Sequence, residues 1–130
     1  MQKPWNFTQV FYGGVIEEVV FRFGFMSFFT WLFNLWFSNI LWSIWIANIL
    51  AALLFALAHL PSVQQLKVTD TKLIYLYMNS TNAILGLVCG WLYWKEGLAA
   101  AIICHMTFHI VWFIAEKIEP HVQKHDDLLV

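Results

Sequence analysis

The sequence predicts an all-α fold, a polytopic transmembrane bundle of about four helical spans. Of its 130 residues, 61% are hydrophobic and 12% are charged, whereas a soluble domain is nearer half apolar and a quarter charged. The apolar residues form four stretches, each close to the ~20 residues that a helix needs to cross the hydrocarbon core. Each stretch is one continuous run rather than a set of short alternating segments, which favours helices over the strands of a barrel.

Four apolar stretches of the sequence are the expected spans. They cover about residues 7–33, 40–59, 73–94 and 98–118. Pro61 follows the second span and Pro120 the fourth, and a proline disfavours continuation of a helix. No internal repeat or linker divides the chain, so residues 1–130 are expected to form a single transmembrane domain.

Charge and tryptophan placement predict the same topology. With four spans, both termini and the second loop lie on one side, which carries Lys3, Lys67, Lys72, Lys117 and Lys124. The opposite side carries Lys95 alone, so the positive-inside rule places both termini in the cytoplasm and the chain in the cell membrane. Six tryptophans fall near the opposite, headgroup-level ends of the spans: Trp31, Trp36, Trp42, Trp45, Trp91 and Trp94.

Composition also excludes other functions. The net charge of −1 and the lack of a long basic run disfavour nucleic-acid binding. The two cysteines, Cys89 and Cys104, lie inside apolar stretches and form no C-x-x-C pair. We therefore expect them to be small buried side chains.

Ionisable side chains inside the expected spans are the strongest functional signal. Each costs at least ~2.5–3.5 kcal/mol at the centre of a bilayer and calls for a functional or structural reason. The residues concerned are Glu17, Glu18 and Arg22 in the first span, His59 in the second, and His105 and His109 in the fourth.

Their spacing suggests how they are arranged. Glu18 and Arg22 are four residues apart, so they share a helix face as an ion pair, either structural or part of the site. Glu17 points about 100° away from its neighbour and is the acid expected to meet another helix. His105 and His109 share one face at a similar depth. We expect these groups to converge in one cavity.

Three motifs in order resemble a known family. Residues 17–22 match E-E-x-x-x-R, residues 55–59 match F-x-x-x-H, and residues 105–109 resemble H-x-x-x-N with histidine in place of asparagine. This pattern resembles the type II CAAX prenyl endopeptidase and bacteriocin-processing family, also called CPBP or Abi. The resemblance covers nearly the whole chain, from about Gly13 to about Trp112.

The resemblance implies an intramembrane endopeptidase that cuts membrane-associated peptides, prenylated or bacteriocin-like. Glu17 and His59 would activate a water molecule, while His105 and His109 would line the oxyanion site. Family members commonly have further spans before the first motif, so the chain is expected to be shortened at its N-terminus. Four spans do not easily seal such a site from lipid, which predicts a homodimer or a membrane partner. Small residues are available for close helix contact: Ala51, Ala52, Gly86 and Gly90.

Alternatives remain open at this point. Catalysis without a metal cofactor is preferred because Glu17 is needed as the base and the chain has no H-E-x-x-H. Zinc is the alternative, with Glu17, His59, His105 and His109 as ligands. A second hypothesis is that the protein is a non-catalytic membrane binding or immunity protein with the same fold. A haem-binding bundle, with His59 opposite His105 or His109, would leave the two glutamates unexplained.

Overall fold

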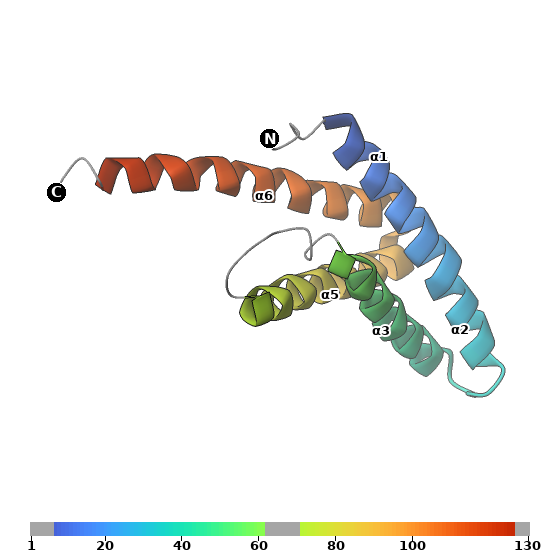
Figure 1. Cartoon of the computed structure of the whole chain (residues 1–130). Coiled ribbons are helices and arrows are strands. Elements are labelled where there is room, and N and C mark those ends of the chain that lie inside the picture. The colour runs from blue at the N-terminus through green and yellow to red at the C-terminus, as the bar shows by residue number, and fades with distance from the viewer. Residues whose placement is uncertain (1–6, 62–70, 127–130) are drawn as a thin grey trace.

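The structure is a computed structural model, which describes the backbone of residues 7–61 and 71–126 and the side chains of residues 11–61 and 72–115. The described residues are almost all helical, with no strand among them, so the predicted all-α fold is confirmed (Figure 1). The elements are α1 (Phe7–Glu18), the π-helix η1 (Val19–Met26), α2 (Ser27–Asn34), α3 (Ile40–Ala58), α5 (Thr71–Glu96) and α6 (Leu98–Asp126).

The first three elements form one continuous helical rod. Glu18 and Ser27, at its two internal junctions, both keep right-handed helical backbone angles, and the ribbon runs unbroken from α1 to α2 (Figure 1). The backbone N–H of Ser27 donates to the carbonyl of Arg22, five residues earlier, which is the hydrogen bond of a π-helix. The sequence predicted the rod but not the π-helix, which has no simple apolar signature.

Three of the helices are long and apolar enough to cross a membrane: Ile40–Ala58, Lys72–Glu96 and Leu98–Ala115. The rod falls outside this group because the π-helix divides it into shorter segments. The helix α6 itself continues past Pro120 to Asp126, beyond the end near residue 118 that was predicted for the last span. A proline has no backbone N–H, so one hydrogen bond of this helix is left unmade.

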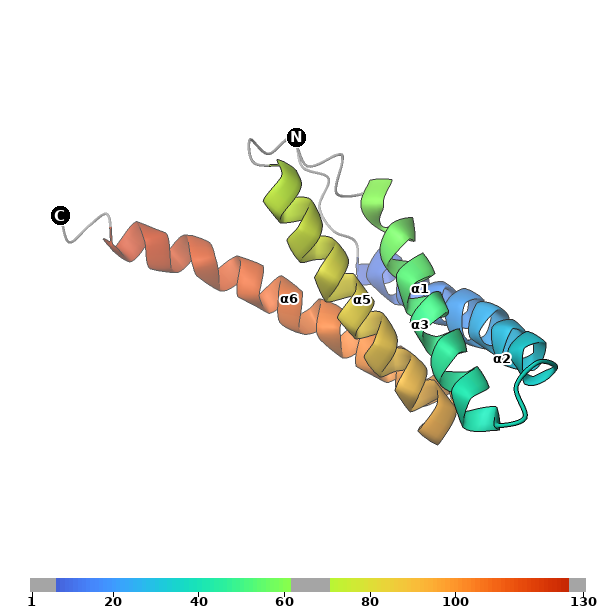
Figure 2. The same ribbon diagram turned by 90° about the horizontal axis from the view of Figure 1, so that it is seen from below.

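The helices are arranged around α3. It lies between the rod and α5, while α6 packs against α5 and crosses α1 (Figures 1 and 2). The C-terminal half of α6 projects beyond the other helices in both views. Only part of α6 is therefore available to the site, namely the part that crosses α1.

Small residues allow α3 and α5 to approach closely. A side-chain carbon at Gly86 would lie 3.0 Å from the Cα of Ala52, and one at Gly90 would collide with the amide of Asn48. The Asn48 amide also donates to the carbonyl of Leu87 at 3.2 Å. Ala51 is fully buried as well. These small residues therefore form the close helix contact for which the sequence made them available, and they form it within the chain.

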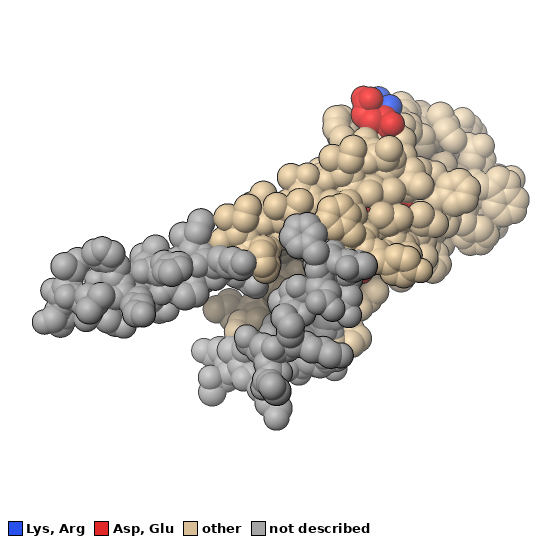
Figure 3. All heavy atoms as spheres, turned by 90° about the horizontal axis from the view of Figure 1, so that it is seen from above, with Lys and Arg blue, Asp and Glu red and all other residues tan. Residues whose placement is uncertain are grey.

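The outer surface is largely apolar. Many large hydrophobic side chains are exposed, among them Trp36 (81%), Leu73 (72%) and Phe23 (64%). Their number exceeds the few scattered apolar residues that a soluble protein usually exposes. Figure 3 shows one face as uncharged side chains with a single small cluster of charged atoms at its edge. Apolar surface of this extent suits hydrocarbon rather than water.

Candidate active site

Three elements bring the six predicted site residues together. The rod supplies Glu17 and Glu18 from the end of α1 and Arg22 from η1, α3 ends next to His59, and α6 supplies His105 and His109. The side chains of Glu18, Arg22 and His105 are fully buried. Those of Glu17 and His59 are 32% and 24% exposed, so they form the accessible edge of the cluster.

The buried part of the cluster is a hydrogen-bonded chain. Arg22 Nε donates to Glu18 Oε2 at 2.9 Å, as the spacing of the two residues predicted. The second oxygen of Glu18 accepts from His105 Nδ1 at 2.7 Å, across to α6. Sequence reasoning missed this second contact, because helical periodicity places residues on a face but does not say which face meets which helix.

Phe55 is a site residue that the sequence analysis did not single out. Its ring lies 4.5 Å from the His59 ring and 5.4 Å from that of His105, between centroids, and the Arg22 guanidinium carbon stands 5.4 Å above it. The two terminal nitrogens of Arg22 have no hydrogen-bond partner among the described residues. The aromatic face therefore supplies part of the stabilisation that this cation needs. The signal was present, since Phe55 opens the F-x-x-x-H motif.

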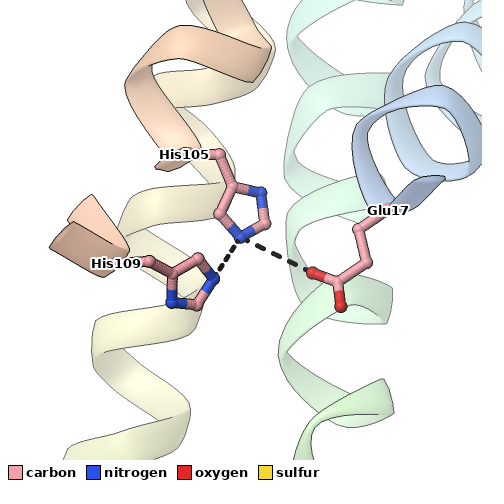
Figure 4. A group of neighbouring side chains, drawn as sticks. All are labelled: Glu17, His105 and His109. Atoms are coloured by element: carbon pink, nitrogen blue, oxygen red, sulfur yellow. Dashed lines mark hydrogen bonds and ion pairs between the residues drawn. The ribbon is translucent and has the colours of Figure 1, made fainter. Parts of the chain in front are cut away.

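Glu17 faces two histidines from different helices. Its Oε2 lies 3.5 Å from His105 Nε2 and 3.6 Å from His59 Nε2, and Figure 4 shows the carboxylate turned toward the His105 ring. Both separations exceed an ordinary N–H···O hydrogen bond. Within the described residues this oxygen, although buried, has no hydrogen-bond partner. It is therefore free to act on another molecule.

The hydrogen bonds fix the orientation of the His59 imidazole. Its Nδ1 lies 2.9 Å from the carbonyl oxygen of Phe55, which can only accept, so Nδ1 carries the proton. In a neutral ring, Nε2 then presents a lone pair toward Glu17. Glu17 and His59 thus present two acceptors to each other, an arrangement that a molecule with two O–H donors would bridge.

His105 and His109 lie within hydrogen-bond distance of each other. Their Nε2 atoms lie 2.9 Å apart, and the two rings are stacked at a 28° interplanar angle (Figure 4). Because Glu18 holds the proton on His105 Nδ1, a neutral His105 accepts at Nε2 from His109. When the pair carries one more proton, His105 donates instead and His109 carries its N–H on Nδ1 rather than on Nε2.

Three of the side chains also converge as metal ligands would. Glu17, His105 and His109 each offer one ligand atom, and these atoms all lie within 4.8 Å of one another. His59, the fourth ligand expected from the sequence, is not part of this group. The two cysteines take no part in it, and both are free thiols, Cys89 buried and Cys104 half-buried.

The fold and the site define a helical membrane protein with a buried glutamate–histidine cluster. Comparison with protein families finds a match over residues 3–111 to the family described as Type II CAAX prenyl endopeptidase Rce1-like. The match spans well over half of the chain, and the protein belongs to this family. The family predicted from the three motifs is therefore confirmed. Searches of curated proteins and of solved structures found no match.

Proposed function

We propose that the protein is an intramembrane endopeptidase that hydrolyses peptide bonds of membrane-associated substrates, prenylated or bacteriocin-like, with water activated by Glu17 and His59. The family supports a protease of the CAAX type. The observation that carries the mechanism is the Glu17 oxygen, buried and without a hydrogen-bond partner among the described residues, facing His59 across 3.6 Å.

Water activation follows from the two facing acceptors. A water molecule bridging Glu17 and His59 donates one hydrogen bond to each, which directs its own lone pair toward a substrate carbonyl. Glu17 takes the proton as the oxygen–carbon bond forms, and it then delivers that proton to the leaving amine. His59 stays oriented throughout because the Phe55 carbonyl holds its Nδ1–H.

The His105–His109 pair is suited to stabilise the oxyanion. In the state with one additional proton, His105 donates to His109, and the Nδ1–H of His109 is left as a donor for a developing negative charge. The buried Glu18 carboxylate lies 2.7 Å from His105 Nδ1 and stabilises the positive charge that this state needs.

Glu18 is a poorer candidate for the base than Glu17. Both of its oxygens are engaged, by Arg22 and by His105, and its side chain is fully buried. A proton taken up by Glu18 would weaken both contacts in a medium of low dielectric constant. We therefore assign Glu18 and Arg22 to holding His105 in place.

A second candidate function is a membrane binding or immunity protein that keeps the fold without catalysis. It is favoured by His109, which replaces the usual asparagine of the third motif and is already bonded to His105. The two candidates make opposite predictions for hydrolysis.

The test is proteolysis in liposomes that contain the purified protein and a fluorescent prenylated C-terminal peptide or a bacteriocin-like precursor. The wild type should cleave one of these classes, and Glu17→Gln should lower turnover by ~10²–10⁴, the range that general acid–base catalysis supplies. Glu96→Gln makes the same chemical change at an exposed residue at the end of α5 and should keep full activity. Cleavage that persists in Glu17→Gln would overturn the assignment, and a wild type inactive on both classes would favour the binding protein.

A further inference from the structure

We infer that Glu17, His105 and His109 form a binding site for a divalent transition-metal ion such as Zn²⁺, and that this ion inhibits the enzyme by occupying the catalytic base. The inference concerns regulation of the proposed active site, and its inhibitory part rests on that proposed function. The evidence for the metal site itself is the geometry of the three ligand atoms and the buried Glu18 carboxylate that contacts His105.

The first observation is the set of ligand atoms. Imidazole nitrogens and a carboxylate oxygen are ligands that zinc takes, at about 2.0–2.2 Å, which places tetrahedral ligands roughly 3.3 Å apart. His105 Nε2 lies 2.9 Å from His109 Nε2 and 3.5 Å from Glu17 Oε2. All three atoms lie within 4.8 Å of one another. Small side-chain rotations therefore suffice to close the shell around an ion.

The second observation is the carboxylate behind His105. Histidines that bind metals commonly donate their other ring N–H to a carboxylate, which fixes the tautomer and raises the basicity of the ligating nitrogen. Glu18 does this here, accepting from His105 Nδ1 at 2.7 Å. It is fully buried and held in turn by Arg22. The lone pair of His105 Nε2 is thus directed at the point where the other two ligands meet.

The third observation is the short distance between the Nε2 atoms of His105 and His109. Two lone pairs at 2.9 Å repel each other unless something positive lies between them. In the metal-free protein a proton fills that place, and a divalent ion would replace it with release of the proton.

The ion would inhibit because it takes the base away. In zinc peptidases with an H-E-x-x-H motif, the general base is a glutamate that does not bind the metal. Here the metal-binding carboxylate is Glu17 itself, and its neighbour Glu18 is occupied by Arg22 and His105. The metal-bound site has no remaining carboxylate to accept a proton from water.

Asparagine at position 109 would break the site. An amide is a poor zinc ligand compared with imidazole, so His109→Asn leaves two ligands instead of three. Loss of a group that merely orients a ligand already costs 10–100-fold in affinity. Loss of a ligand should cost at least ~100-fold. Metal sensitivity is therefore a property of this chain's own His109, rather than of the H-x-x-x-N motif.

The experiment measures Zn²⁺ binding directly, by competition with a chromogenic chelator in detergent micelles. The protein carries no polyhistidine tag, and His121 and His125 are replaced by Gln so that C-terminal histidines bind no metal. The wild-type site should bind one Zn²⁺, with at least ~100-fold weaker binding in His109→Asn. Co²⁺ should give the visible absorption of a tetrahedral complex in the protein with the wild-type site but not in His109→Asn. Equal Zn²⁺ binding by both proteins, or none by either, would overturn the site.

Inhibition is tested in the liposome assay, with each protein compared with its own activity after treatment with a strong chelator. Added Zn²⁺ should suppress the cleavage activity of the wild type. His109→Asn should need at least ~100-fold more Zn²⁺ for the same fractional loss of activity. If the chelator abolishes activity and Zn²⁺ restores it, the ion is catalytic and the inhibitory role is overturned. If Zn²⁺ binds at the site but no variant cleaves a substrate, the proposed function fails and the metal site remains supported by the binding data.

Discussion

His105 Nδ1 on α6 donates to Glu18 Oε1 on α1 at 2.7 Å, a contact between residues 87 positions apart in the chain. Arg22 holds the other oxygen of the same carboxylate from one turn further along the rod. One fully buried carboxylate thus connects the first motif to the third. It sets the tautomer of His105, and through His105 it sets what His109 can donate or accept.

Glu18→Gln is predicted to destabilise the fold more than it impairs any single chemical step. Glutamine offers one acceptor oxygen and one amide, so it cannot accept both from Arg22 Nε and from His105 Nδ1. Breaking a buried ion pair from one side typically costs about 3–5 kcal/mol. Unfolding in mixed micelles should show a loss of that order for Glu18→Gln, a small change for Glu17→Gln, and almost none for exposed Glu96→Gln. A stable but inactive Glu18→Gln beside an active Glu17→Gln would mean that the two roles are reversed.

The donor role of position 109 predicts different results for two substitutions. His109→Asn supplies an amide N–H and should keep turnover within about tenfold of the wild type. His109→Ala removes the donor and should cost ~10²–10³, the usual scale for one oxyanion hydrogen bond. Both are measured with chelator present, so that metal inhibition does not contribute. If the two variants behave alike, position 109 does not act as a donor.

The same role predicts a pH dependence. Donation from His109 needs one additional proton on the His105–His109 pair, so turnover should fall as the pH rises and this proton is lost. The amide of His109→Asn donates at any pH, and this alkaline fall should therefore disappear in that variant. An identical pH–rate profile for the two proteins would argue against the role of this proton.

The sequence predicted the helical class, the approximate helix bounds and the identity of all six clustered residues, because each depends on local patterns. Apolar run length marks the helices, and an ionisable residue within such a run stands out by its cost. Helix starts and ends agree to within a few residues, apart from the end of α6 beyond Pro120.

Features that depend on contacts between helices were not predictable. The rotation of α6 about its axis decides that His105 meets Glu18 as well as Glu17. The π-helix after Glu18 changes the register of every residue that follows it in the rod, and no periodic signal precedes it. The small residues of α3 and α5 were recognised as contact residues, but their partner proved to be within the same chain. The homodimer or membrane partner remains a prediction.

The topology predicts which loops are accessible from outside the cell. From the lysine distribution and the positive-inside rule we predict that the α3–α5 connection lies in the cytoplasm and that Lys95, at the end of α5, lies on the opposite side. A cysteine introduced at Lys67, which lies outside the described residues, should resist an impermeant thiol reagent in intact cells and react after lysis. A cysteine at Lys95 should react in intact cells. In both proteins Cys89 and Cys104 are replaced by Ala, so that only the introduced cysteine can react. The reverse labelling pattern would show that the orientation is the opposite of the predicted one.

The contact between Gly90 and Asn48 predicts a non-additive effect on stability. A methyl group at Gly90 would overlap the Asn48 amide, which is buried and donates to the Leu87 carbonyl at 3.2 Å. Gly90→Ala should therefore push α3 and α5 apart or displace the amide, at a cost of about 1–3 kcal/mol, the usual range for overpacking. Gly24→Ala is the matched control, because the nearest atom to its new carbon would be the Val19 carbonyl oxygen at 3.6 Å, an ordinary contact. That control should be neutral or slightly stabilising.

A double-mutant cycle identifies the cause. Asn48→Ala loses the hydrogen bond to Leu87 but also removes the group that a methyl at position 90 would strike. Gly90→Ala should then cost less in the Asn48→Ala background than in the wild type, by about 0.5–3 kcal/mol, as expected for residues in direct contact. The four proteins are compared by unfolding in mixed micelles, with Gly24→Ala added to each background as a reference. Additive free energies of unfolding would show that Gly90 is needed for some reason other than the close approach of α3 and α5 at Asn48. A coupling of the predicted sign would show that this contact sets the position of α3, and thereby the position of His59 beyond its C-terminal end relative to Glu17.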